Sequence, residues 1–257
     1  MGEIALVRER DGVAHLEINR PEARNALTTQ MTAALAEHVV ALENNPDVHV
    51  IVVSGAGDKA FSAGYDINEM SDFDEAQSLL NYIKRQPMLW AIANCAKPTI
   101  GAINGFAHGA GAIIAAALDM RIGCPATEFR FTAAAYGGVN NTWQLPRVVG
   151  LARALEYVLS ARPIRGQEAL SAGLLNHLAE SPAACIEQSL ELAARIARHP
   201  SAAIQLSRQL IHACESRDLQ AAYQAENDVM NTQLRPGRPA EIFDQFLHRK
   251  PGNPSVD

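Results

Sequence analysis

The chain has 257 residues, of which 48% are hydrophobic and 19% are charged, and its formal net charge is −6. This length and apolar content suit one large domain, or a domain with an appended part, and exclude a largely disordered chain. Charges of both signs are mixed along the sequence, with no basic stripe to follow nucleic acid phosphates. There is neither an apolar run of the ~20 residues that a membrane helix needs nor an apolar secretion signal in MGEIALVRERDG. We therefore expect a soluble, cytoplasmic protein that binds neither nucleic acid nor membrane.

The first predicted elements are a hairpin, a helix and a buried strand. Residues 4–19 alternate apolar and polar side chains around an Asp-Gly pair, which is typical of a β-hairpin. After a polar loop, Thr28 or Thr29 is placed to cap an amphipathic helix. The apolar run at 48–57 ends in glycine and predicts a buried strand.

The middle of the chain contains a strand–turn–helix–strand pattern, and the last part is helical. Strands predicted at 98–105 and 120–125 flank an alanine-rich helix, which indicates a parallel sheet. Past Gly150 nearly every segment has helical periodicity, so the architecture is an α/β core followed by helices. The predicted helices are LARALEYVLSA, GQEALSAG, PAACIEQSLELAARIARH, SAAIQLSRQLIHACES, DLQAAYQAENDVMNTQLR and PAEIFDQFLHRK.

The cysteines do not indicate a metal site or a disulfide framework. They are scattered and show no CxxC spacing, which favours buried free thiols in a reducing compartment. The four residues are Cys95, Cys124, Cys185 and Cys214.

Two glycine-containing loops stand out because each follows a predicted strand and precedes a predicted helix. One is GFAHGAGA, at 105–112, and the other surrounds Ala63-Gly64 in KAFSAGYDINEM. Backbone N–H groups at a helix start can bind a negative charge. Two such loops can therefore aim two N–H groups at one oxygen, forming an oxyanion hole. The alternative is that the small residues serve only to pack the core.

Several motifs, in this order, resemble the crotonase (enoyl-CoA hydratase/isomerase) superfamily. They are NRPEARNAL, AFSAGYDINEM, KPTIGAINGFAHGAGAIIAAALDMRI, ALSAGLLNHL and FLHRKP. The resemblance implies an α/β fold with a crotonase-like ββα spiral core at 1–195 that binds an acyl-CoA thioester. It also implies a C-terminal α-helical trimerisation region at 196–257, and thus a homotrimer or hexamer. Coenzyme A would enter as part of the substrate, with no separate cofactor and no metal.

The resemblance also assigns site residues. The oxyanion donors fall on the main-chain N–H groups of Tyr65 and Ala110. The positions that correspond to coenzyme A contacts are Arg24, Ala26, Ala63, Asp66, Ile67, Phe243 and Lys250. A guanidinium is well suited to pair with a phosphate. For Arg24 and Lys250, however, ordinary surface charge is the competing interpretation.

The two glutamates that serve hydratases of this family have no counterpart. Their positions correspond to Ile113 and Ala133, and neither side chain can transfer a proton. The position of the nucleophilic aspartate of the family's dehalogenases falls near Asn141, and an amide is no nucleophile. An ordinary hydratase reaction is therefore not expected.

Other polar and aromatic side chains remain candidates. Tyr65 and His108 are the candidate proton-transfer groups, although His108 is equally suited to a structural role. The segment expected to face the acyl group contains Tyr136, Asn141 and Trp143. Decarboxylation suits this inventory best, because loss of CO₂ generates an enolate without a base. Hydrolase or other lyase chemistry also stays open, and so does a noncatalytic acyl-CoA-binding or scaffold protein.

Overall fold

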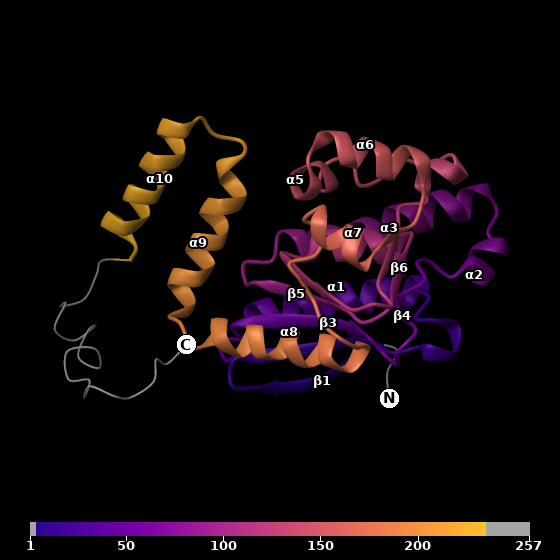
Figure 1. Ribbon diagram of the computed structural model, residues 1–257, viewed down its shortest axis with the longest axis horizontal. Helices are drawn as coiled ribbons and strands as arrows, with labels where there is room; N and C mark the ends of the chain where they lie inside the picture. Colours follow the sequence, from indigo (N-terminus) through magenta and orange to yellow (C-terminus); the bar gives the residue numbers. More distant parts are fainter. Residues whose placement is uncertain (1–3, 235–257) are drawn as a thin grey trace. The chain divides into compact units, whose positions relative to one another are not determined.

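The computed structural model describes residues 4–234. It divides into a larger unit that ends at Ser201 and a smaller one that begins at Ala202. The larger unit contains two β-sheets with helices packed around them (Figure 1). The division expected after residue 195 stays a prediction; that residue lies within the last turn of a helix of the larger unit.

The main sheet has six strands, and its first two form the hairpin that the sequence predicts. In spatial order they are β1 (Ile4–Arg10), β2 (Val13–Ile18), β3 (Val50–Gly55), β5 (Thr99–Ile103), β7 (Met120–Gly123) and β10 (His177–Leu178). Only β1 and β2 pair antiparallel, and every other neighbouring pair is parallel. The predicted parallel arrangement is therefore confirmed.

Both faces of this sheet are covered. Side chains that alternate along β2 and β3 point in turn to two apolar clusters, as the period of two in a strand requires. One face packs against helix α8 (Pro182–Ala197), which lies along the sheet in Figure 1. The other face packs on α1 (Thr29–Asn44), whose first turn is capped by the Thr28 hydroxyl.

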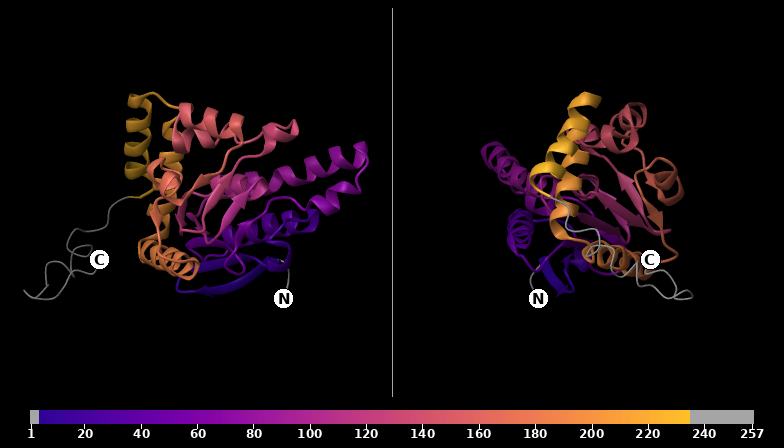
Figure 2. Two further views of the ribbon diagram at one scale, coloured as in Figure 1. Left: turned by 45° about the vertical axis from the view of Figure 1, so that its right-hand side comes forward. Right: turned by 90° about the vertical axis from the view of Figure 1, so that its left-hand side faces the viewer.

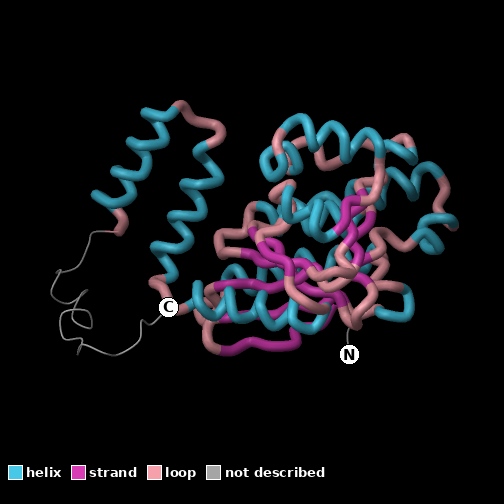
Figure 3. Tube along the Cα trace, viewed as in Figure 1, coloured by secondary structure: helices cyan, strands magenta, loops and turns pink. Residues whose placement is uncertain are grey.

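The larger unit has a second sheet of four short strands, coloured magenta together with the main sheet in Figure 3. Its strands are β4 (Ala60–Ser62), β6 (Phe106–His108), β8 (Glu128–Arg130) and β9 (Ile164–Arg165). β4, β6 and β8 are parallel to one another, and β9 is antiparallel to β8. The sequence analysis does not anticipate this sheet, because two or three residues are too few to show an alternating pattern.

Helix α4 (Ala110–Ala117) packs against the second sheet, and α2 (Ile67–Ser71) and α3 (Glu75–Ala93) follow β4 along the chain. Helix α4, which follows β6, is buried at all eight positions. Helix α3 lies beside α1 (Figure 2), and the short α2 follows the loop after β4. The remaining short helices of this unit are η1 (Pro21–Ala23), η2 (Ala133–Tyr136), α5 (Leu145–Val149), α6 (Leu151–Ser160) and α7 (Gly166–Ser171).

Helix α9 (Ser201–Cys214) begins at the last residue of the larger unit, and the rest of it belongs to the smaller unit. The smaller unit also contains α10 (Leu219–Thr232). Both predicted helices are confirmed, and within the described residues neither has a fully buried side chain. The role of this part in oligomer formation stays a prediction. The helix expected at 239–250, with Phe243 and Lys250, lies outside the described residues.

The cysteine prediction is right for three residues and wrong for one. Cys95, Cys124 and Cys185 are buried and form no disulfide within the described residues, whereas Cys214 is exposed. The reason is that Cys214 lies on α9, a helix with no buried position. Residues 4–234 contain neither a helix long and apolar enough to cross a membrane nor a cluster of three side chains suited to bind a metal.

Candidate active site

The two glycine loops meet at the ends of adjacent parallel strands, β4 and β6. Gly64 has a φ of +97°, and a Cβ placed on it would lie 2.8 Å from the His108 carbonyl oxygen and 3.1 Å from the Ala110 amide nitrogen. Only glycine permits both this backbone conformation and this close approach. The amides of Tyr65 and Ala110 are therefore brought into the same neighbourhood, as an oxyanion hole requires.

Both amides are available as donors. Ala110 is the first residue of α4, where a backbone N–H has no partner within the helix. The residues on either side of Tyr65 are hydrogen-bonded to Leu27. The Leu27 N–H donates to the Gly64 carbonyl at 2.7 Å, and the Asp66 N–H donates to the Leu27 carbonyl at 2.9 Å. Within residues 4–234, neither the Tyr65 N–H nor the Ala110 N–H donates a hydrogen bond. The Ala110 donor at the start of a buried helix suits a negatively charged oxygen, and the unused Tyr65 donor lies in the neighbouring loop.

The backbone around these donors is held in place by direct contacts. A Cβ on Gly111 would lie only 2.4 Å from the Ser62 carbonyl oxygen, so α4 and β4 approach as closely as their backbones allow. The Ser62 hydroxyl donates to the Asn25 carbonyl at 2.8 Å and accepts from the Gly64 N–H at 3.2 Å. The donors are thus positioned before any ligand arrives, which is what makes such sites effective.

The Tyr65 side chain is covered by a buried arginine of α3. The Arg85 guanidinium carbon lies 4.0 Å from the centre of the Tyr65 ring, a cation–π contact. Arg85 is itself held at 3.3 Å by the Thr29 hydroxyl and at 3.3 Å by the Glu69 carboxylate. Burial raises the pKa of Tyr65, and the Arg85 charge only partly opposes this. The phenol therefore stays protonated at neutral pH and can donate a proton or a hydrogen bond.

The His108 side chain is paired with Glu128, a residue of the neighbouring strand β8. Its Nε2 lies 3.1 Å from Glu128 Oε1, and Glu128 also pairs with Arg165 at 2.9 Å. Its ring contacts Phe106, two residues earlier on the same face of β6, whereas Ala107 points to the core. Burial lowers the pKa of His108, and the hydrogen bond to Glu128 only partly opposes this. The carbonyl of His108, rather than its ring, is what lies against Gly64.

We predict that His108→Ala lowers thermal stability and leaves any catalytic rate within about threefold of the wild type, because the ring is tied to Glu128 rather than to the oxyanion loops. The loss of one such hydrogen bond costs about 1 kcal/mol. Thermal melts and steady-state rates check this, with the exposed His177→Ala as the control. A loss of roughly 10²-fold in rate with coenzyme A binding retained would instead make His108 a proton-transfer group.

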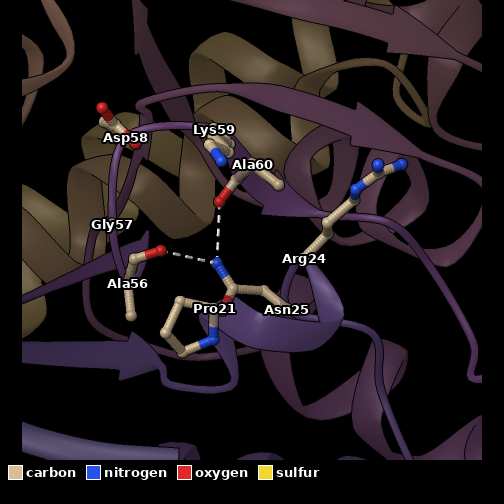
Figure 4. A pocket seen from close by; sticks show the side chains of 8 residues that line it. All are labelled: Pro21, Arg24, Asn25, Ala56, Gly57, Asp58, Lys59 and Ala60. Atoms are coloured by element: carbon tan, nitrogen blue, oxygen red, sulfur yellow. Dashed lines mark hydrogen bonds between the residues drawn. The ribbon is translucent and has the colours of Figure 1, made fainter.

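A cavity of about 230 Å³ lies beside the loop before β4 (Figure 4). Asn25 lies at the rim of the cavity and stabilises the loop there. Its side-chain nitrogen donates to the carbonyls of Ala56 at 3.0 Å and Ala60 at 2.7 Å. Arg24 and Lys59 line it, both exposed, and within residues 4–234 neither side chain makes an ion pair or hydrogen bond. The cavity is also lined by Asp58, so its charged lining is two cations and one carboxylate, a net positive charge that suits an anionic group such as a phosphate.

Lys59 is the residue of this cavity that the sequence analysis missed. Arg24 is singled out by the resemblance, but Lys59 comes from a separate loop, and only the fold brings the two together. The available signal is its position as the first residue of KAFSAGYDINEM, directly before β4.

The other predicted coenzyme A contacts lie nearby in the chain but differ in availability. Ala63 donates its N–H to the Arg24 carbonyl at 3.0 Å, and Ala26 closes the turn after η1. The Asp66 carboxylate caps α2 and pairs with Arg20, which lowers the pKa of Asp66, so its charge is already used within the protein. The side chain of Ile67 is exposed. Of these four residues, Ile67 is the one whose side chain is accessible to a ligand.

The segment expected to face an acyl group begins beside the oxyanion loops. A Cβ on Gly109 would lie 3.3 Å from the hydroxyl of Thr132, the residue that precedes η2. Further along, the Trp143 ring lies 6.5 Å from that of Trp90 on α3. Tyr136 is exposed and Asn141 is buried, so these predicted residues differ widely in accessibility.

Ile113 and Ala133 have only hydrocarbon side chains. These are the two positions that the resemblance aligns with proton-transfer glutamates. Ile113 is buried in the first turn of α4, and Ala133 is the first residue of η2. Neither contributes a group that can hold or move a proton.

Comparison with known proteins identifies the family of this chain. The family model described as enoyl-CoA hydratase/isomerase matches residues 8–250. The chain is 32% identical over 249 residues to a short-chain-enoyl-CoA hydratase of Clostridium acetobutylicum, covering 95% of each chain. It is 33% identical over 254 residues to a 2,3-dehydroadipyl-CoA hydratase of Escherichia coli, covering 97% of each. A crystal structure of an enoyl-CoA hydratase from Bacillus anthracis superposes with a TM-score of 0.89 at 26% identity, covering 96% of each. The chain belongs to the enoyl-CoA hydratase/isomerase family and has the crotonase fold.

Proposed function

We propose that this protein is an enzyme that stabilises the enolate of an acyl-CoA thioester between the N–H groups of Tyr65 and Ala110. The observation that carries the proposal is the close approach of Gly64 to the Ala110 amide, which gathers two unused donors at one point. A thioester enolate concentrates negative charge on one oxygen. Removing one such donor from an enzyme typically costs about 10²–10³-fold in rate. The cations Arg24 and Lys59 support a coenzyme A phosphate at the neighbouring cavity.

Decarboxylation of a malonyl-type thioester is the reaction that this set of groups supports best. The bond between the α-carbon and the carboxylate breaks, CO₂ leaves, and the electron pair passes into the thioester to form the enolate. No general base is required for that step. The neutral Tyr65 phenol or water then returns one proton to the α-carbon. Hydrolysis and other lyase reactions that pass through a thioester oxyanion draw on the same two donors.

We predict that the purified protein hydrates crotonyl-CoA at a negligible rate. Hydration needs a base for water and an acid for the α-carbon, and each such group contributes about 10²–10⁴-fold. Ile113 and Ala133 supply neither. Loss of the crotonyl-CoA absorbance on addition of enzyme measures this rate, with a hydratase of the family as the control. A rate within about tenfold of that control would contradict the prediction and require another proton-transfer pair.

The second candidate function is a noncatalytic acyl-CoA-binding protein, which the apolar side chains of Ile113 and Ala133 favour. The two positioned oxyanion donors argue against it, because binding alone does not need them. A mass-spectrometric screen of crotonyl-, malonyl- and methylmalonyl-CoA, among a wider panel of acyl-CoAs, separates the two. Conversion of any member supports an enzyme. Tight binding with no conversion across the panel supports the binding protein.

A further inference from the structure

The loop that carries the Tyr65 N–H is joined to a second loop, residues 20–28, on both sides of that residue. Both backbone hydrogen bonds that flank Tyr65 involve Leu27, which is fully buried and pairs with Tyr65 in an isolated parallel bridge. The position of the Tyr65 N–H therefore depends on the position of Leu27. Contacts that hold the loop of residues 20–28 also hold one of the two oxyanion donors.

The loop of residues 20–28 has a backbone that needs support. Arg24 and Asn25 have φ values of +55° and +57°, in the left-handed region that residues other than glycine seldom adopt. Arg20 supports this turn through its backbone. The Asn25 N–H donates to the Arg20 carbonyl at 2.8 Å, and the Arg20 N–H donates to the Asn25 side chain at 3.0 Å. Backbone strain persists where surrounding contacts over-determine it, and it clusters at functional sites.

The Arg20 guanidinium also joins the two loops. Its Nη1 donates to the Ala26 carbonyl at 3.4 Å and to the Asp66 carboxylate. Ala26 precedes Leu27, and Asp66 follows Tyr65. One nitrogen atom thus bonds to the neighbour of each residue in the bridge.

The Asp66 carboxylate is buried, and its charge is compensated. Its side chain is 7% exposed, and besides Arg20 it accepts the N–H groups of Asn68 at 2.9 Å and Glu69 at 3.3 Å, at the start of α2. The hydrogen bond from Arg20 is the largest influence that lowers the pKa of Asp66, so this carboxylate is charged at neutral pH. A buried ion pair is weak evidence of a gain in stability. Fixing the relative position of two elements is a better reason to keep one.

We propose that Arg20 and Asp66 are positioning residues of the oxyanion hole, whose ion pair holds the Tyr65 N–H toward the thioester oxygen. The inference rests on the proposed function, since it assumes that this N–H is one of the two donors. An oxyanion donor is effective when it is aligned before the oxygen arrives, and a hydrogen bond weakens steeply when it bends. The Asp66 side chain then acts through Tyr65 rather than as a contact to coenzyme A.

Infrared difference spectroscopy tests this role with butyryl-CoA labelled with ¹³C at the thioester carbonyl. On the wild type, two hydrogen bonds should lower the carbonyl stretching frequency. Arg20→Gln and Asp66→Asn should each retain roughly half of that shift, because one of the two donors is then misaligned. Asp66→Asn keeps the cap of α2, since asparagine and aspartate cap helices equally well. Arg20→Lys, which keeps the charge, should recover part of the shift. The matched control Arg162→Gln, which breaks ion pairs with α6 and α7 instead, should show all of it.

A combination with Ala110→Pro locates the effect on one donor. If Arg20 acts through the Tyr65 N–H, the double variant Arg20→Gln with Ala110→Pro should show no shift, because the two donors contribute separately. A residual shift equal to that of Ala110→Pro alone would contradict a role at Tyr65. Free coenzyme A should bind Arg20→Gln with the wild-type affinity, because a positioning residue does not contact the ligand. Weaker binding would make Arg20 a ligand contact and overturn the inference.

The outcomes separate the inference from the proposed function. Folded Arg20→Gln and Asp66→Asn proteins with the full wild-type shift overturn the inference and leave the proposed function standing. Failure of both variants to fold also overturns it, since the ion pair would then serve the fold as a whole. An unshifted carbonyl band in the wild-type complex overturns the proposed function itself.

Discussion

Ala110→Pro is expected to lower the rate on any thioester that the protein converts by at least about 10²-fold, while the protein still folds. The substitution deletes one oxyanion donor. Ala110 occupies the first position of α4, where the helix itself does not use the N–H and where proline is well tolerated. The change therefore removes the N–H from the site with little cost to the helix. Steady-state rates, with circular dichroism to verify the fold, measure the effect.

The matched control is Ala110→Gly, which changes the side chain at the same position but keeps the donor. It is expected to retain most of the rate, because the contribution of this residue to catalysis is its backbone. A folded Ala110→Pro variant with a normal rate would show that the glycines of GFAHGAGA serve packing alone and that the oxyanion assignment is wrong.

Replacing both cations of the cavity, Arg24→Gln with Lys59→Gln, is expected to weaken coenzyme A binding by about 10²-fold, or about tenfold for each charge. Both side chains line the cavity and make no ion pair within the described residues, so each is available to a phosphate. The wild-type affinity should also fall with added salt, and the double variant should show a weaker salt dependence. Titration of free coenzyme A at two salt concentrations measures both effects.

Arg198→Gln is the control for a general change in net charge, since Arg198 is exposed at the end of α8 and does not line the cavity. It should bind coenzyme A as the wild type does. Wild-type affinity in the double variant would mean that the phosphates bind elsewhere on the protein.

The elements that sequence analysis predicts correctly are those with a local signal. The hairpin of β1 and β2 is marked by alternation around an Asp-Gly turn, and the start of α1 by a threonine that caps it. The glycine loops are recognisable because glycines before a buried helix indicate unusual backbone geometry. Gly64 has the geometry that this signal implies, since its φ is +97° and its backbone lies close to the Ala110 amide.

The features that escape prediction depend on contacts between distant parts of the chain. Arg85 and Tyr65 are twenty positions apart and meet only because α3 folds over the loop after β4. Lys59 lies at the same cavity as Arg24 because Asn25 joins the turn after η1 to the loop before β4. The engagement of the His108 ring by Glu128 follows from the pairing of β6 with β8, strands too short to be read from the sequence.

The central claim is that the Tyr65 and Ala110 amides polarise a thioester carbonyl, and infrared difference spectroscopy tests it without knowledge of the natural substrate. Butyryl-CoA labelled with ¹³C at the thioester carbonyl is bound to the wild type and to Ala110→Pro. Two hydrogen bonds to the oxygen weaken the carbonyl bond, so its stretching frequency should fall on binding to the wild type and fall less in the variant. An unshifted carbonyl band in the bound wild-type complex would contradict the account.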